Sequence, residues 1–167
     1  MRIFIAAKLD ESIADKISEY QAELKHVGIT GNYTKKDNMH MTLAFIGDYD
    51  YPDKILDVLK DTSFRPVRLS FDGIGHFGEL YFVRLKDNPQ LFGYVKRLRK
   101  HLSDNNIPFD KKRFLGHITI LRKARFKDGT SLPEKNVPKG DMTLKKISLM
   151  RSEFTDNGVK YTEIGSI

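Results

Sequence analysis

The chain contains two short segments in which a histidine and a threonine stand two residues apart. The segments are residues 40–45 (HMTLAF) and 117–122 (HITILR), and the polar residues concerned are His40, Thr42, His117 and Thr119. Apart from Arg122, the other residues of both segments are apolar and typical of β-strands, in which residues two apart point to the same face. Two such pairs around one substrate would supply an acid, a base and two hydroxyl donors. That set is sufficient to cleave a phosphoester without a metal ion.

The surroundings of these segments also repeat along the chain. Residues 2–9 and 79–85 are typical of buried strands, and an amphipathic helix follows each of them. The apolar stripes of the two helices lie 78 positions apart at every member, namely Ile13, Ile17, Tyr20 and Leu24 against Leu91, Val95, Leu98 and Leu102. Residues 69–71 and 147–149 are again 78 apart, and His117 follows His40 by 77. The pattern favours an internal duplication over a chance recurrence of common patterns.

A duplication gives a physical reason for the two histidines to meet. Two similar lobes pack most simply around a pseudo-two-fold axis, as identical subunits do, and equivalent residues near that axis face one another. We therefore predict an α+β fold of two lobes, with helices outside mainly antiparallel sheets. The chain has 167 residues, of which 40% are hydrophobic, which is enough for a core shared by both lobes. We predict one two-lobed domain over residues 1–167.

The composition excludes several classes of site. The chain has no cysteine, which excludes a disulfide framework, a thiolate nucleophile and a thiolate metal site. Residues 1–8 (MRIFIAAK) are too short and too soon interrupted by charge for a signal peptide, and no apolar run approaches the length of a membrane span. We expect a cytoplasmic protein that binds no membrane, with a monomer as the default state.

The charge of the chain favours an anionic partner. The net charge is +7, and nucleic acid is the obvious candidate. Basic clusters at residues 111–113 (KKR) and 122–125 (RKAR) flank the second histidine, where a phosphate substrate would need positive charge. Charge alone is equally consistent with solvation of a protein surface.

A structural role and metal binding are two other interpretations of the histidines. A lone histidine in an apolar strand is most often a buried, hydrogen-bonded imidazole. Two of them, each with threonine at the same spacing in a repeat, favour a shared site instead. Zinc needs three protein ligands even in catalytic sites, and neither segment holds a carboxylate or a further histidine. We predict no metal and no other cofactor, and we place His26, His76 and His101 outside the site.

Three segments are predicted as connections. Residues 28–38 are typical of a turn that leads into the first histidine segment. Residues 73–78 (GIGHFG) are typical of a flexible connection between the halves. In residues 126–142 the apolar residues follow neither the helix nor the strand period, and we expect a mobile loop at the rim of the site.

The paired H-x-T segments resemble those of the 2H phosphoesterase superfamily. Within it, the chain is most similar to the RNA 2′,3′-cyclic phosphodiesterases, also described as 2′-5′ RNA ligases. The similarity runs nearly end to end and includes residues 2–6 (RIFIA), 38–47 (NMHMTLAFIG), 73–77 (GIGHF), 114–122 (FLGHITILR) and 149–153 (LMRSE), with Gly158 and Tyr161 after the last of these. Gly116 departs from the pattern, because relatives often have proline before the second histidine.

The resemblance implies two lobes with a groove between them and opening of an RNA 2′,3′-cyclic phosphate to a 2′-phosphate. It implies that His40 is the proton donor and His117 the proton acceptor. The two motifs are so similar that the sequence alone does not decide between these roles. Thr42 and Thr119 would donate hydrogen bonds to the non-bridging phosphate oxygens, where charge develops. Imidazole suits both roles because its ordinary pKa of about 6.5 makes both protonation states available near neutral pH. In reverse, the site would join RNA ends through a 2′-5′ bond.

Three further residues are candidates for substrate contact. By resemblance, Arg122 contacts the phosphate or ribose, although strict strand alternation would turn it away from His117. Tyr33 and Phe114 are able to stack on a base, but core packing explains each of them better. Two alternatives stay open: the same chemistry on a small cyclic nucleotide or ADP-ribose cyclic phosphate, and a non-catalytic RNA-binding module.

Overall fold

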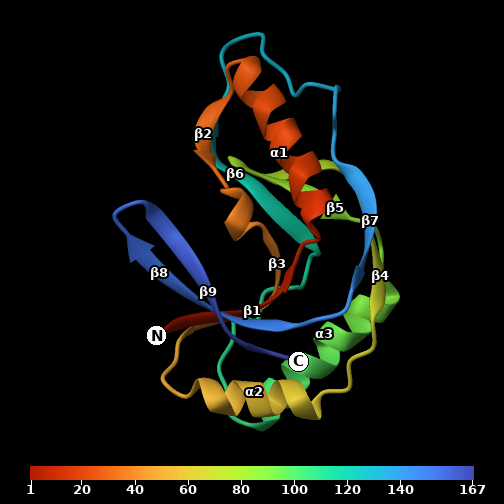
Figure 1. Cartoon of the computed structure of the whole chain (residues 1–167), viewed down its shortest axis with the longest axis vertical. Coiled ribbons are helices and arrows are strands. Elements are labelled where there is room, and N and C mark those ends of the chain that lie inside the picture. The colour runs from red at the N-terminus through yellow and green to blue at the C-terminus, as the bar shows by residue number, and fades with distance from the viewer.

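The computed structural model describes residues 1–167, with nine strands, three α-helices and one short 3-10 helix (Figure 1). In chain order the elements are β1 (Arg2–Lys8), α1 (Glu11–His26), β2 (Thr30–Tyr33), η1 (Lys36–Asn38), β3 (His40–Asp48), α2 (Pro52–Asp61), β4 (Val67–Phe77), β5 (Leu80–Leu85), α3 (Pro89–Asp104), β6 (His117–Arg125), β7 (Lys139–Leu144), β8 (Ser148–Thr155) and β9 (Gly158–Ser166). No helix has the length and apolar character that crossing a membrane requires.

The strands form two antiparallel sheets. The first sheet has the order β3-β1-β8-β9, and the second has the order β2-β6-β5-β4-β7. The first sheet lies with α2 and α3 in the lower part of Figure 1, and the second lies with α1 in the upper part. The predicted α+β fold of two lobes, with antiparallel sheets and helices outside, is confirmed.

Each half of the chain contributes to both lobes. β1 and β3 share a sheet with β8 from the second half, whereas β5 and β6 share the other sheet with β4 from the first half. The long helices also cross over: α1 follows β1 but contacts β7 of the second sheet, and α3 follows β5 but contacts β3 of the first. Because of this exchange, the equivalent strands β3 and β6 lie in different sheets and contact one another where the lobes meet.

The helices form where the sequence pattern predicts them. The apolar stripes of α1 and α3 are buried at every predicted position, and each helix has 16 residues. The Asn88 side chain accepts a hydrogen bond from the Leu91 backbone N–H, and Pro89 occupies the first turn, so α3 begins with two strong start signals. Thirty-five buried residues from both halves form one apolar cluster, which packs the lobes against each other.

The three predicted connections all contain strand residues. Residues 73–77 form the end of β4, which pairs with β5 in a hairpin, so the prediction of a flexible link at residues 73–78 is wrong. Residues 139–142 begin β7, which pairs with β4, and residues 30–33 form β2, which pairs with β6. Glycine and charged residues interrupt the apolar alternation that would predict a strand in these segments. The strands form nevertheless, because distant strands supply their backbone hydrogen-bond partners.

Candidate active site at the junction of the two lobes

The two histidines begin the two strands that meet between the sheets. His40 is the first residue of β3, and His117 is the first residue of β6. Both side chains are half-buried, as are those of Thr42 and Thr119 two positions later. A cavity of about 160 Å³ at this junction is lined by Thr42 and Phe45 from one motif strand and by His117 from the other. The fold therefore brings side chains of both motifs to one place.

The His40 ring is held by hydrogen bonds at both nitrogen atoms. Its Nδ1 atom lies 2.7 Å from the carbonyl oxygen of Asn38, and its Nε2 atom lies 2.9 Å from the hydroxyl oxygen of Thr42. A carbonyl only accepts, so Nδ1 carries the proton and donates it. In the neutral ring, Nε2 is therefore the basic atom and accepts the hydrogen bond from Thr42.

The His117 ring is oriented in the same way. Its Nδ1 atom lies 2.5 Å from the carbonyl oxygen of Leu115, again two residues before the histidine. The same argument places the proton on Nδ1 and leaves Nε2 as the atom that exchanges protons. In both histidines, a backbone carbonyl two residues earlier thus fixes the tautomer with the proton on Nδ1. Both rings therefore have Nε2 available for proton exchange.

Aromatic side chains pack against both imidazoles. The rings of Phe4 and Tyr161 have their centroids 4.9 and 5.2 Å from that of His40. The rings of Phe82 and Phe77 lie 5.1 and 5.8 Å from that of His117. Phe4 and Phe82 are 78 positions apart, so the spacing of the duplication marks this pair in the sequence, although sequence reasoning did not assign them to the site.

A glycine makes room for one of these rings. A β-carbon on Gly75 of β4 would lie 2.7 Å from the ring of Phe82, which is closer than side chains pack. Gly116, directly before His117, is similarly confined, because a β-carbon there would lie 2.4 Å from the Leu85 side chain. Both glycines therefore allow the close packing that positions His117 and its neighbours.

Burial lowers the pKa of His40 from its ordinary value. The hydrogen bond to the Asn38 carbonyl acts in the opposite direction, and the positive charges of Arg122 and His117 lower the pKa further. The influence of both residues on His40 links the second motif strand electrostatically to the first. The neutral form of His40 is favoured in the free protein.

A bulge in each motif strand changes which later side chains face the site. The pairing of β3 with β1 skips Leu43 and, beyond Phe45, also Ile46, and the pairing of β6 with β5 skips Ile120. The extra residue reverses the alternation, so the face that carries the histidine and threonine continues at Phe45 and at Arg122. The expectation that alternation turns Arg122 away from the site is therefore wrong, and its charge acts on His40.

Tyr33 and Phe114 lie in packed positions. Tyr33 is half-buried, and its hydroxyl donates to the Ile29 carbonyl oxygen at 2.6 Å. Phe114 lines the cavity but packs against the core and against Phe92, at 5.2 Å between ring centroids. Two of the histidines expected to lie outside the site have other partners: His101 is hydrogen-bonded to the Thr62 hydroxyl, and His76 stacks on Tyr81. Tyr33 and Phe114 therefore both make packing contacts, and Phe114 also lines the cavity.

Similarities to known proteins identify the family of the chain. Residues 8–81 match the family described as LigT like Phosphoesterase. The chain is 31% identical to the RNA 2′,3′-cyclic phosphodiesterase of Methanocaldococcus jannaschii, over 98% of each chain. It is 29% identical to the protein of that name from Methanothermobacter thermautotrophicus, over 98% of this chain and 96% of the other. The fold is similar to that of E. coli LigT in a complex with 3′-AMP, with a TM-score of 0.83 at 22% identity over 99% of this chain and 96% of the other. The chain therefore belongs to the LigT-like phosphoesterases of the 2H superfamily.

Proposed function

We propose that the protein hydrolyses the 2′,3′-cyclic phosphate at the end of an RNA and leaves a 2′-phosphate. The observation that carries this proposal is the pair of equivalent imidazoles, each of which donates from Nδ1 to a backbone carbonyl and keeps Nε2 for proton exchange. The name of the relative that is 31% identical over nearly the whole chain supports the choice of substrate.

In the proposed reaction, each histidine moves one proton. Nε2 of neutral His117 takes a proton from a water molecule as its oxygen attacks phosphorus. The bond between phosphorus and the ribose 3′-oxygen breaks, and Nε2 of protonated His40 gives its proton to that oxygen. The products are a 2′-phosphate and a 3′-hydroxyl. Each proton transfer of this kind typically accelerates a reaction roughly 10²- to 10⁴-fold.

The substrate itself supplies the charge that His40 needs. The lowered pKa of His40 favours the neutral ring in the free protein. A bound phosphate carries a negative charge, which favours the imidazolium form and raises the pKa. Protonated Nε2 no longer accepts from Thr42, so its N–H is available to the ribose 3′-oxygen and the Thr42 hydroxyl hydrogen becomes free to bond a non-bridging phosphate oxygen. Phosphate binding and the donor role of His40 are therefore coupled through Thr42.

Product analysis on a defined substrate tests the proposal. Adenosine 2′,3′-cyclic phosphate and a short RNA with the same end are incubated with the protein and EDTA, and the phosphate position is read by ³¹P NMR. We expect a 2′-phosphate and unchanged rates with the chelator. His40→Ala and His117→Ala should each lose about 10²- to 10⁴-fold in rate while keeping the wild-type circular dichroism spectrum. A 3′-phosphate product, or full activity in either variant, contradicts the mechanism.

The same arrangement also suits the joining of RNA ends, with His40 again giving its proton to the ribose 3′-oxygen that leaves phosphorus. With an RNA 5′-hydroxyl in place of water and a 2′,3′-cyclic phosphate as the other substrate, His117 would deprotonate the hydroxyl and a 2′-5′ bond would form. A non-catalytic RNA-binding module, by contrast, predicts that His40→Ala leaves RNA binding and every other measured property unchanged.

A further inference from the structure

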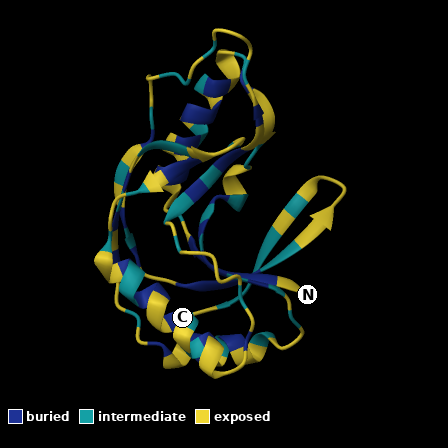
Figure 2. Ribbon diagram, turned by 180° about the vertical axis from the view of Figure 1, so that it is seen from behind, coloured by how far each residue is buried: buried dark blue, intermediate teal, exposed yellow.

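Phe154 lies near the tip of the β8–β9 hairpin and is 87% exposed, more than any other large apolar side chain of the protein. The hairpin stands away from the body, and its outer part is exposed (Figure 2). One exposed apolar side chain needs no explanation in isolation. Three features, however, connect this residue to the active site. They are the side of the sheet on which it lies, the hydrogen bonds that hold the hairpin, and a neighbouring cationic side chain.

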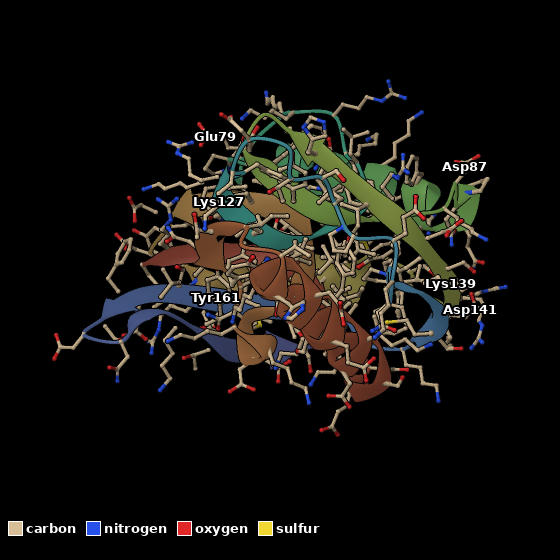
Figure 3. All side chains as sticks on the ribbon, turned by 90° about the horizontal axis from the view of Figure 1, so that it is seen from above. Glu79, Asp87, Lys127, Lys139, Asp141 and Tyr161 are labelled. Carbon is tan, nitrogen blue, oxygen red and sulfur yellow. The ribbon has the colours of Figure 1, made fainter.

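Phe154 shares a face with the aromatic residue that contacts His40. Within the hairpin, Ser152 pairs with Tyr161 and Phe154 pairs with Val159, without an irregularity between these pairs. Paired residues, and residues two apart on one strand, point to the same side of a sheet. Phe154 therefore lies on the side that carries Tyr161, about 6.8 Å further along the strand. In Figure 3, Tyr161 lies near the base of the projecting hairpin.

The hairpin is fastened to the turn that orients His40. The side-chain nitrogen of Asn38 donates to the Val159 carbonyl oxygen at 2.9 Å, while the carbonyl oxygen of Asn38 accepts from His40. At the tip, the Lys35 amine donates to the Asn157 carbonyl oxygen. These bonds hold Phe154 at a set position relative to the reacting imidazole.

Positive charge accompanies the exposed ring. Arg2 pairs in register with Ser152, so its side chain lies on the same face as Phe154 and Tyr161, and it is exposed. Its guanidinium carbon lies 4.8 Å from the centre of the Phe45 ring at the edge of the site. Aromatic rings beside cationic side chains are the usual equipment for binding single-stranded nucleic acid. The other tip residues, 155–158 (TDNG), are exposed and polar, which disfavours a membrane or an apolar protein surface as the partner.

On the basis of the proposed function, we propose that Phe154 stacks on the base of the nucleotide next to the one that carries the cyclic phosphate, with Arg2 beside the connecting backbone. The substrate is then an RNA of at least two nucleotides, and the hairpin distinguishes RNA ends from free cyclic mononucleotides.

Two substrates and one binding probe test this assignment. The substrates are adenosine 2′,3′-cyclic phosphate and a short RNA with a 2′,3′-cyclic phosphate end, and the probe is a fluorescein-labelled RNA with a 2′-phosphate end. Phe154→Ala should lower kcat/KM for the RNA and weaken probe binding by roughly 5- to 100-fold, the range for one stacked base. Hydrolysis of the mononucleotide should stay unchanged, and Phe154→Trp should retain RNA activity. Tyr51→Ala removes another exposed ring, 60% exposed and at the start of α2 rather than in the hairpin, and should change neither value.

Each other outcome is decisive. If Phe154→Ala cleaves and binds RNA like the wild type, or loses activity equally on both substrates, the stacking assignment is overturned while the proposed reaction stands. If the wild type hydrolyses neither substrate, the proposed reaction fails, and the anisotropy measurement with the unreactive probe still decides whether Phe154 binds RNA.

Discussion

The Nε2 atom of His40 lies 2.9 Å from the hydroxyl oxygen of Thr42, so the two polar groups of the first motif are bonded to each other before any substrate binds. The hydroxyl donates a hydrogen bond to the neutral ring. Once the ring is protonated, the hydroxyl is able to donate a hydrogen bond to a phosphate oxygen instead. A residue that looks like a simple oxyanion donor is therefore also a partner of the proton donor.

We expect Thr42→Val to lower kcat/KM by roughly 10- to 150-fold, the range for one hydrogen bond to a charged group. Valine has nearly the same shape but lacks the hydroxyl, so folding should be retained. Thr42→Ser keeps the hydroxyl and should stay within a few-fold of the wild type. Equal activity of the valine and serine variants in steady-state assays would exclude a role for the hydroxyl.

His40 should make the protein less stable as the pH falls. Its pKa is lowered in the native state, chiefly by burial. Below the ordinary value of about 6.5, the unfolded chain therefore binds a proton that the native state resists, and stability drops through this range. We expect Tm to fall more steeply between pH 7.5 and 5.5 in the wild type than in His40→Gln. His26→Gln, at an exposed helix end, should follow the wild type, and equal slopes in all three proteins would contradict the prediction.

Arg122 should act on both the substrate and His40. Because its positive charge lowers the pKa of His40, Arg122→Ala should raise that pKa in an NMR titration of the histidine rings. Loss of a charged phosphate contact should also raise KM by roughly tenfold or more. Arg65→Ala removes an equal charge from an exposed position near α2 and should change neither quantity. An unchanged His40 titration in Arg122→Ala would place the side chain outside the site.

Gly75→Ala should impair catalysis through Phe82. The new β-carbon would lie 2.7 Å from the Phe82 ring, which in turn packs 5.1 Å from His117. The ring must move, and we expect a loss of about tenfold in kcat together with about 1–3 kcal/mol in the free energy of unfolding. Gly93→Ala in α3 is the control, because a β-carbon there would make only an ordinary van der Waals contact with Arg97. It should stabilise the helix by about 0.5–1 kcal/mol without affecting kcat. Wild-type kcat in Gly75→Ala would show that the Phe82 ring does not position His117.

The two lobes should unfold together. Each sheet contains strands from both halves, so neither half has its own complete sheet. We expect one transition in calorimetry, with equal calorimetric and van't Hoff enthalpies. Fragments cut at the β4–β5 turn, residues 1–78 and 79–167, should each be unfolded alone. Two separate transitions, or a fragment that folds alone, would contradict a single domain over residues 1–167.

Local patterns were enough to predict the histidine segments and the long helices. The repeat of His40 at His117, and of the α1 stripe in α3, follows from side-chain periods of two and 3.6 residues. These periods depend only on neighbouring residues, so they are visible without knowledge of the fold. The 78-residue offset added the expectation that equivalent strands meet, and β3 and β6 are in contact.

The exchange of β4 and β8 between lobes, the bulges and the side of the sheet on which Arg122 lies required the folded chain. Each of them depends on which distant backbone pairs with a strand, and a single skipped residue at Ile120 reverses the face of everything after it. The same holds for Tyr161, which packs on His40, and for Phe154 on the same face of the hairpin, because β9 and β8 join the sheet that holds His40. Short-range periodicity thus predicted which residues are equivalent, whereas long-range strand pairing set which of them share a surface.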